Sequence, residues 1–335
     1  MRPLVHPALT QVWRDDSTVQ IGLDPARAVV VGGMGPVETT VLRAIDGVRD
    51  EAALRNAAQW AGGDAAVADR LISILGSAGV LVDGDRATAA DPDDALTPDR
   101  AVLGLLTTDP DGGAMAMGSR QRATVVVRGC GRVGSVVAGL LGAAGVGQVL
   151  VDDDAPVTAA DLAPGGHGPD DIGRPRARAV EARLAASTED DQPQEPDLVV
   201  LAPSTGSARY DAAMLLRAGV THLVALVVET TGIVGPLVLP GRSSCLRCHD
   251  LHRTARDPVW PRILAQADRS PPDVTACDVT LATQAAATAA QQVLAHLDGF
   301  VPATVDGTVE ICLPYGLARR RRWHPHPACG CMWAA

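Results

Sequence analysis

Residues 124–154 read TVVVRGCGRVGSVVAGLLGAAGVGQVLVDDD, and this stretch predicts the fold. The β-branched run Thr124–Val127 is typical of a buried parallel strand, because helices cover such strands on both faces. A GxGxxG motif follows at Gly129–Gly134, then a helix of small residues over Ser135–Ala144 and a second strand over Gln148–Val151. The order strand, glycine turn, helix, strand predicts the first unit of a Rossmann-like sheet.

The glycines and the acids after the second strand are candidate nucleotide contacts. In a Rossmann turn, Gly129 would permit the tight bend, Gly131 would let a phosphate approach the backbone, and Gly134 would let helix and strand pack closely. The helix N-terminus would offer free N–H groups to an anion. Asp152–Asp154 lie where a carboxylate accepts ribose hydroxyls. The same glycines also suit a protein that needs only close packing, so both interpretations stay open.

The alternation of strands and helices continues beyond this unit. Arg174–Leu184 and Tyr210–Ala218 have helical spacing, whereas Leu198–Ala202 and His222–Val228 are apolar runs typical of strands. A long alanine-rich helix is expected over Val279–Leu297. These elements together predict an α/β protein with a doubly wound sheet.

A smaller unit precedes the sheet. Residues 86–100 are acidic and contain proline, which is typical of a linker, so we expect a small domain over 1–85 and the Rossmann-like domain over 101–335. Within 1–85, short β segments flank three amphipathic helical patterns. This arrangement predicts a winged-helix-like domain. The expected helices are Pro36–Ile45, Glu51–Trp60 and Ala65–Leu75.

The charge of the chain limits its partners. The 335 residues carry a net charge of −10, which argues against nucleic acid or an anionic membrane as the main target. The run Arg319–Arg322 opposes this trend, and we interpret it as a solvated turn rather than an anion-binding patch. The sequence contains no lysine, so no lysine can contact phosphate or form a Schiff base.

The chain has the features of a cytoplasmic protein. Its N-terminus, MRPLVHPALTQ, lacks the charged and apolar regions of a signal peptide. The longest apolar stretch, Val136–Val151, is interrupted by glycines and is shorter than the ~20 residues that span a bilayer. We therefore expect no membrane association.

Four of the seven cysteines form two close pairs, Cys245/Cys248 and Cys329/Cys331. Four thiolates in two short turns are the ligand set of a structural zinc site, which has no open position for catalysis. A redox dithiol at Cys245/Cys248, or a site completed by His249, His324 or His326, is the alternative. The remaining cysteines stand alone and are expected to be small buried hydrophobes: Cys130, Cys277 and Cys312.

The order of these motifs resembles the ThiF / ubiquitin-activating-enzyme superfamily over about residues 120–335. The ending around Cys329 and Cys331, together with the small N-terminal domain, is similar to the ThiF-like proteins of azole-modified peptide biosynthesis. This resemblance implies a leader or precursor peptide bound by the N-terminal domain and a YcaO-type cyclodehydratase as partner. It also implies a homodimer formed through the α/β domain.

The resemblance implies ATP and Mg²⁺ as well, but the sequence departs from the active members. Those proteins place an Asp on the ribose, an Arg in an Asn-Leu-x-Arg-Gln segment, a Lys in Gly-x-Pro-Lys and a metal-holding Asp in Cys-Thr-Asp-Asn. Here Asp152 matches the ribose contact, Asp161–Pro164 lacks the arginine, Arg176 replaces the lysine, and Ser204 replaces the metal-holding Asp. If a nucleotide site is retained, its contacts would be Gly129, Gly131, Gly134, Asp152, Asp154 and Arg176.

These departures favour a peptide-presenting scaffold with a degenerate adenylation site. The alternative is an ATP-dependent adenylyltransferase that activates the carboxylate of a small ubiquitin-like or sulfur-carrier protein. In that case Arg176 and Cys277, near where some relatives carry a sulfur-transferring cysteine, are the catalytic candidates, although a structural thiol fits Cys277 better. An NAD-dependent oxidoreductase is a third and weaker reading, which rests on the glycine motif alone.

Overall fold

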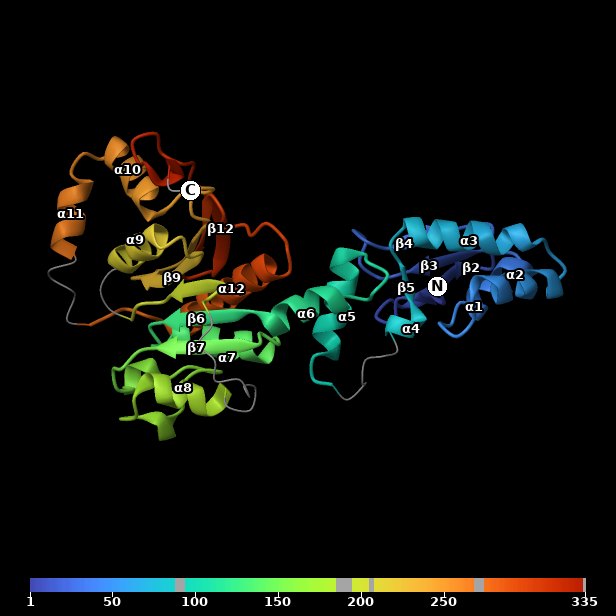
Figure 1. Cartoon of the computed structure of the whole chain (residues 1–335), viewed down its shortest axis with the longest axis horizontal. Helices are drawn as coiled ribbons and strands as arrows, with labels where there is room; N and C mark the ends of the chain where they lie inside the picture. The colour runs from blue at the N-terminus through green and yellow to red at the C-terminus, as the bar shows by residue number, and fades with distance from the viewer. Residues whose placement is uncertain (88–93, 185–194, 205–207, 268–273, 334–335) are drawn as a thin grey trace. The chain divides into compact units, whose positions relative to one another are not determined.

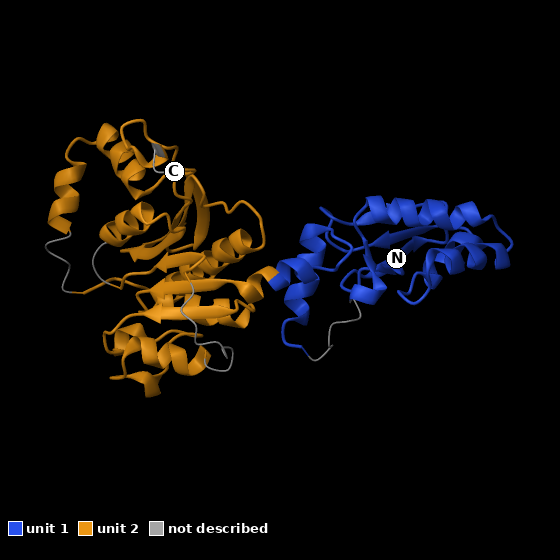
Figure 2. Cartoon of the chain, viewed as in Figure 1, with its two compact units in different colours: residues 1–118 blue, residues 119–335 orange. Residues whose placement is uncertain are grey.

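The computed structural model describes residues 1–87, 94–184, 195–204, 208–267 and 274–333. Its contacts divide the chain into two compact units, residues 1–118 and 119–335, which are drawn in blue and orange in Figure 2. Each unit has its own apolar core. No helix among the described residues is long and apolar enough to span a membrane.

Unit 1 combines two small antiparallel sheets with three amphipathic helices. A two-stranded sheet joins the first and fifth strands, and a three-stranded sheet has the order β2-β3-β4. Asp50 and Asp64 cap α2 and α3 by accepting hydrogen bonds from backbone N–H groups of the first turn. The elements are β1 (Pro3–Val5), β2 (Gln11–Asp15), β3 (Thr18–Ile21), β4 (Val29–Val31), α1 (Pro36–Ala44), α2 (Glu51–Trp60), α3 (Ala65–Ser77) and β5 (Leu81–Asp83).

The three helices lie where the apolar spacing predicts them, to within two residues at each end. Their inner faces pack on the sheet in a core that includes Ile21, Leu54 and Leu75, all fully buried. The winged-helix-like character of this unit stays a prediction.

The predicted linker differs from the division that the contacts define. Its described parts are partly helical, because α4 (Gly84–Ala87) and α5 (Thr97–Thr107) both enter 86–100. Helix α5 belongs to unit 1, since Arg27 donates a hydrogen bond to the Leu105 carbonyl at 2.6 Å. The division after Gly118 therefore lies beyond the expected start of the second domain at residue 101, inside α6 (Ala114–Arg122). The composition of residues 86–100 indicated a polar segment, but it could not show the contacts that hold α5 in unit 1.

Unit 2 contains a seven-stranded sheet with the order β12-β11-β10-β9-β8-β6-β7. Strands β7, β6, β8 and β9 are parallel, and β10, β11 and β12 extend the sheet in antiparallel fashion. The parallel half confirms the doubly wound α/β prediction, whereas the antiparallel half was not predicted. The strands are β6 (Thr124–Arg128), β7 (Gln148–Asp152), β8 (Leu198–Leu201), β9 (His222–Val228), β10 (Thr231–Val238), β11 (Gly307–Cys312) and β12 (Leu317–Arg322).

Helices cover both faces of this sheet (Figure 1). Helices α7 and α12 pack with Val125 and Val200 in the larger core cluster, whereas α9 packs with Val199 and Leu201 on the opposite face. The alanine-rich α12 approaches β10 so closely that a Cβ added to Gly232 would lie 3.3 Å from the side chain of an alanine in α12. The helices are α7 (Gly134–Ala143), α8 (Arg176–Leu184), α9 (Arg209–Arg217), α10 (Leu246–Arg256), α11 (Trp260–Ala267) and α12 (Val279–Leu297).

The interpretation of Arg319–Arg322 as a turn is wrong. These residues belong to β12, which pairs with β11 over its whole length. A run of four arginines has no apolar alternation, so the sequence carried no strand signal there.

Candidate functional site

The glycine motif forms the turn between β6 and α7, and two of its glycines are required by backbone contacts. Gly129 has φ +86°, and a Cβ there would lie 2.3 Å from the Ala202 carbonyl oxygen. A Cβ on Gly134 would lie 1.8 Å from the carbonyl oxygen of Gly129. The packing roles expected of these glycines are thus present whether or not a nucleotide binds.

The three aspartates at the end of β7, Asp152–Asp154, have different surroundings. Asp152 is exposed, and its carboxylate lies 3.4 Å from Arg128 Nε. Asp154 is also exposed. Asp153 turns inward and accepts a hydrogen bond from the Cys130 backbone N–H at 2.7 Å. The Asp153 carboxylate therefore already accepts the hydrogen bond of one loop N–H group, that of Cys130, which a phosphate would otherwise accept.

Arg176, at the start of α8, reaches toward the same loop. Its Nη1 donates to Ser204 Oγ at 3.0 Å and lies 3.3 Å from Asp153 Oδ2. Its Nη2 donates to Asp161 Oδ1 at 2.8 Å, and its Nε donates to Asp161 Oδ2 at 3.2 Å. The structure brings together residues that the sequence placed in four separate motifs.

Asp161 is the partner that sequence reasoning missed. In the sequence, the segment that begins at Asp161 stood out only because it lacks the arginine of active relatives. In the structure, the Asp161 carboxylate is buried and accepts hydrogen bonds from the backbone N–H and the hydroxyl of Thr158. Burial alone would raise the pKa of Asp161, but the Thr158 backbone hydrogen bond and the Arg176 guanidinium hold that pKa below its usual value. Asp161 is therefore ionised at neutral pH, and it neutralises the charge of Arg176.

A second missed residue is His167, which is buried below the glycine loop. Its Nε2 lies 2.7 Å from the Cys130 carbonyl oxygen, and since a carbonyl only accepts, Nε2 carries the proton. Burial is the main cause that lowers the pKa of His167, so the ring is neutral. His167 thus supports the loop through its backbone.

A cavity of about 320 Å³ opens beside this network at the ends of β6, β7 and β8. One arginine, Arg128, and three carboxylates line it, so the net charge of its lining is negative. The carboxylates are those of Asp152, Asp153 and Asp211. Asp154 and Cys277 are not among its described lining residues. A negative lining disfavours the binding of a triphosphate unless cations accompany it.

Cys277 lies beside the glycine loop through its backbone, because its carbonyl oxygen accepts a hydrogen bond from Arg132 at 2.6 Å. The thiol is half-buried, and burial raises its pKa. A raised pKa keeps the thiol protonated at neutral pH, which weakens it as a nucleophile.

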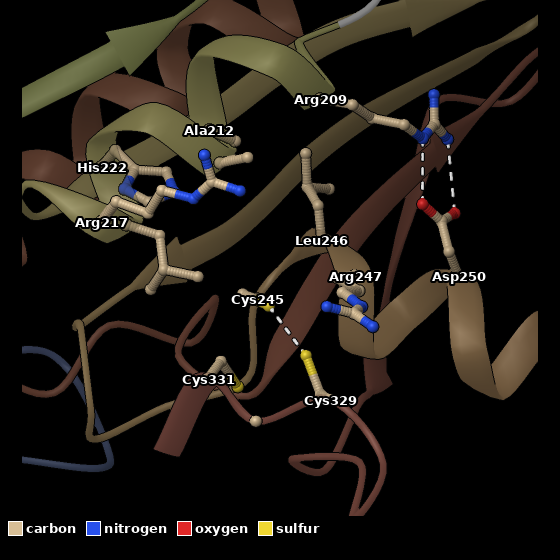
Figure 3. Close-up of a pocket in the computed structure, with 13 residues that line it drawn as sticks. Arg209, Ala212, Arg217, His222, Cys245, Leu246, Arg247, Asp250, Cys329 and Cys331 are labelled. Atoms are coloured by element: carbon tan, nitrogen blue, oxygen red, sulfur yellow. Dashed lines mark hydrogen bonds and ion pairs between the residues drawn. The ribbon is translucent and has the colours of Figure 1, made fainter. Parts of the chain in front are cut away.

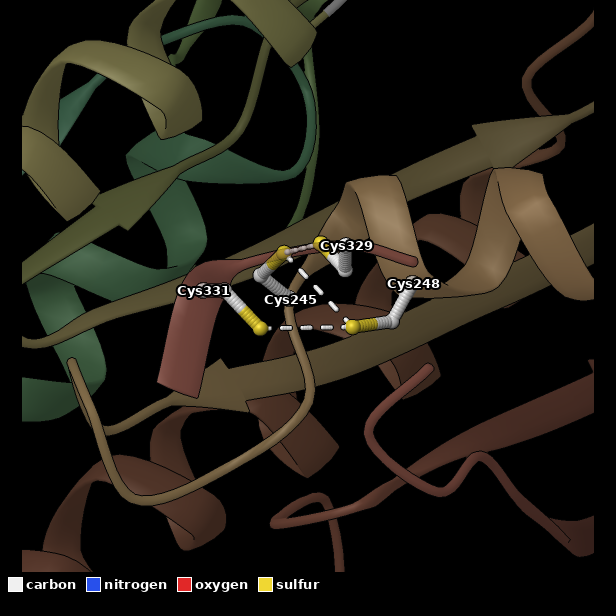
Figure 4. Close-up of side chains that lie close together, drawn as sticks. All are labelled: Cys245, Cys248, Cys329 and Cys331. Atoms are coloured by element: carbon white, nitrogen blue, oxygen red, sulfur yellow. Dashed lines mark hydrogen bonds between the residues drawn. The ribbon is translucent and has the colours of Figure 1, made fainter. Parts of the chain in front are cut away.

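The four paired cysteines meet as the spacing predicts (Figure 4). All are buried, and their Sγ atoms lie within 4.8 Å of one another. Sγ–Sγ distances of 3.5 Å between Cys245 and Cys329 and 3.4 Å between Cys248 and Cys331 approach the ~3.8 Å expected for a tetrahedron with Zn–S bonds of about 2.3 Å. The donor set fits Zn²⁺. His249 is not part of this group, and its ring stacks on Trp323 instead.

A second cavity, of about 360 Å³, lies next to the cysteine cluster between α9 and α10 (Figure 3). Asp250 at its rim pairs with Arg209 at 2.9 Å, and Arg217 and Arg247 also line it. His222 forms part of its wall, where Nδ1 lies 2.9 Å from the Val220 carbonyl oxygen. No sequence motif indicated this cavity.

Comparison with known proteins supports the same architecture. The model of the ThiF family matches residues 113–192. No curated protein is similar enough in sequence to be matched. The solved structure of E. coli MccB with AMPCPP and MccA is similar at a TM-score of 0.75 and 15% identity, over 98% of this chain and 99% of that one.

Two further structures agree with this comparison. E. coli MccB with ATP has a TM-score of 0.73 at 15% identity, over 98% of this chain and 99% of that chain. The solved structure of PaaA is similar at a TM-score of 0.69 and 14% identity, over 95% of this chain and 99% of that chain. At these identities the likeness is one of fold, and it extends over both units of the chain.

Proposed function

Because the chain carries a ThiF-family domain on the fold of the ThiF / ubiquitin-activating superfamily, we propose that it is a peptide-binding scaffold with a degenerate adenylation site. In this proposal unit 1 binds a leader or precursor peptide, and unit 2 is a rigid platform that docks a YcaO-type partner enzyme. Zn²⁺ at the four cysteines stabilises that platform.

One observation carries the proposal. The guanidinium of Arg176, which replaces the phosphate-binding lysine, already donates to Asp161 and Ser204 and lies beside Asp153. A phosphate that approached it would have to displace a buried carboxylate. The cost of leaving Asp161 buried without its partner is about 3–5 kcal/mol, which opposes nucleotide binding in a catalytic geometry.

The position of Ser204 points the same way. Ser204 lies in the segment that follows β8, where active members hold Mg²⁺ with a carboxylate, and its hydroxyl accepts a hydrogen bond from Arg176. A neutral hydroxyl cannot replace an anionic metal ligand. Each lost transition-state group of this kind typically costs about 10²–10³ in rate, so several losses would reduce adenylation by many orders of magnitude.

Unit 1 offers an edge for an extended peptide. Strands β2 and β4 are the two edges of its three-stranded sheet, and most of β2 is exposed, Trp13 included. A peptide strand could add to such an edge through backbone hydrogen bonds. MccB, whose fold this chain shares over 98% of its length, has been solved with MccA, which supports a peptide partner.

Two measurements on the full chain test this proposal. ATP–pyrophosphate exchange with Mg²⁺ is expected at the background rate. Calorimetry with precursor peptides encoded beside this gene is expected to show binding that Trp13→Ala weakens and that Tyr315→Ala, at an exposed aromatic side chain of unit 2, leaves unchanged. No binding by any such peptide would contradict the scaffold, and a YcaO-type partner that fails to co-purify would contradict the docking role.

The second candidate is an ATP-dependent adenylyltransferase, because a cavity of about 320 Å³ lies beside Asp152; its negative lining would require Mg²⁺ to accompany the triphosphate. MccB has been solved with ATP, so this fold accommodates a nucleotide in that protein. Robust exchange that disappears with Asp152→Ala would establish this candidate instead. The variant Cys277→Ser then shows whether the thiol of Cys277 accepts the activated group or is only structural.

Light scattering of the same sample tests whether the chain forms the homodimer that the resemblance implies.

A further inference from the structure

Three arginines converge on one indole ring at the end of unit 2 that carries the cysteine cluster. The guanidinium carbons of Arg253, Arg256 and Arg321 lie 5.3, 5.7 and 5.1 Å from the ring centre of Trp323. The indole itself is 1% exposed. The guanidinium groups therefore help to cover the ring, and of the two on α10, Arg256 is exposed and Arg253 is half-buried.

The support beneath this ring is rigid. The Trp323 indole N–H donates to Thr308 Oγ1 at 3.0 Å, and the His249 ring stacks on the indole at 4.6 Å. Helix α10 begins at the Cys245/Cys248 pair, and β12 is followed by the Cys329/Cys331 pair. A zinc ion at these cysteines would tie together the two elements that carry the arginines.

The charge is concentrated and only partly balanced. Strand β12 also carries the exposed Arg319, on the same face as Arg321, and the exposed Arg322, on the opposite face. Glu310 pairs with Arg319 at 2.8 Å and with Arg321 at 3.4 Å. In the part of the chain that the structure describes, Arg253, Arg256 and Arg322 form no ion pair. This excess of positive charge lies on a chain whose net charge is −10.

Such crowding is unfavourable without an anion. Burial is the main cause that lowers the pKa of Arg253; Asp250 opposes it, and the neighbouring Arg209 and Arg321 lower the pKa further. The indole face offsets part of the repulsion, at about 0.5–1 kcal/mol for each exposed cation–π contact. A ligand with several carboxylates would offset the rest, since guanidinium groups bind carboxylates through paired hydrogen bonds.

We propose that this arginine cluster (Arg253, Arg256 and Arg321 around Trp323) binds an acidic polypeptide segment of a partner protein. Nucleic acid fits the cluster less well for two reasons. The indole is covered, so it offers no face on which a base could stack. The net charge of −10 also repels a long polyanion. A short acidic segment is affected mainly by the nearby arginines, because salt screens charges that lie farther away.

The test uses the full-length, zinc-loaded protein and a fluorescein-labelled octaglutamate peptide, measured by fluorescence anisotropy. We expect the octaglutamine peptide to bind at least about tenfold more weakly, and the affinity for octaglutamate to fall as salt rises. R253Q/R256Q should weaken octaglutamate binding about tenfold or more, because several charge-assisted hydrogen bonds are lost. The control R70Q/R178Q removes the same charge from exposed positions elsewhere and should change the affinity less than about twofold.

Several results would overturn the proposal. These are no binding to the wild type, an equal loss in the control, no loss in R253Q/R256Q, or tighter binding of an oligouridylate than of octaglutamate. Self-association that R253Q/R256Q abolishes would assign the cluster to a second copy of the chain. If R253Q/R256Q lowers the melting temperature or the zinc content, R256Q alone serves instead, because its side chain is exposed.

Discussion

Arg176 and Asp161 form a two-point ion pair in which the guanidinium Nη2 and Nε donate to the carboxylate at 2.8 and 3.2 Å. The side chains are only 12% and 7% exposed. A charged pair with so little solvent depends on both members, since removing one leaves the other buried and unpaired.

The first prediction concerns this pair. Asp161→Ala should reduce the free energy of unfolding by about 3–5 kcal/mol, because it leaves Arg176 partly buried without its main partner. Urea denaturation followed by circular dichroism measures the change. The exposed neighbour Asp170 provides the control, and Asp170→Ala should stay within about 0.5 kcal/mol of the wild type. Equal effects of the two substitutions would contradict the role given to the pair.

The second prediction is a pH dependence. The pKa of Asp161 is lower in the folded chain than its usual value of about 3.9, so its contribution to stability is fully present above that value. The contribution is lost as the pH falls through the folded-state pKa. Between about pH 5 and pH 2, the free energy of unfolding should therefore fall less steeply with decreasing pH in Asp161→Asn than in the wild type, as measured by denaturation at each pH. Parallel curves would show that Asp161 titrates normally.

The third prediction concerns the cysteine cluster. The purified chain should contain one Zn²⁺ per molecule by elemental analysis, since the donor set is closed. Cys248→Ser should weaken zinc binding by more than about 100-fold, because even the loss of an outer-shell partner costs 10–100-fold. Cys312→Ser is the matched control and should retain the metal. A wild type that holds no zinc, with Cys245 and Cys248 joined as a disulfide, would favour the redox dithiol.

The fourth prediction compares two glycines. A Cβ at Gly134 would meet the Gly129 carbonyl oxygen at 1.8 Å, so Gly134→Ala must shift the loop away from α7. Gly76 lies inside α3 with no heavy atom within 4 Å of its added Cβ. We expect Gly134→Ala to destabilise unit 2 by at least about 1–3 kcal/mol, and Gly76→Ala to stabilise unit 1 by about 0.5–1 kcal/mol. Thermal melts of both variants give the comparison; stabilisation by Gly134→Ala would contradict the packing described here.

Local patterns in the sequence determined the Rossmann-like half of unit 2, the helices of unit 1 and the grouping of the cysteines. The strand before Gly129 and the helix after it follow from apolar period and glycine spacing, which depend on neighbours along the chain. The Cys245/Cys248 and Cys329/Cys331 pairs were predictable because thiolate spacing within each short turn already suits one ion.

Tertiary structure alone decided the state of the candidate site. Asp161, Asp153 and Ser204 meet at Arg176 from different segments, and no local pattern shows which carboxylate turns inward. The arginines of β12 form a strand because β11 pairs with them, although their sequence has no strand period. Hydrophobic period is a property of neighbouring residues, whereas charge pairing depends on segments that only folding brings together. This difference is why the Rossmann-like half of the sheet was predictable and the ion pairs around Arg176 were not.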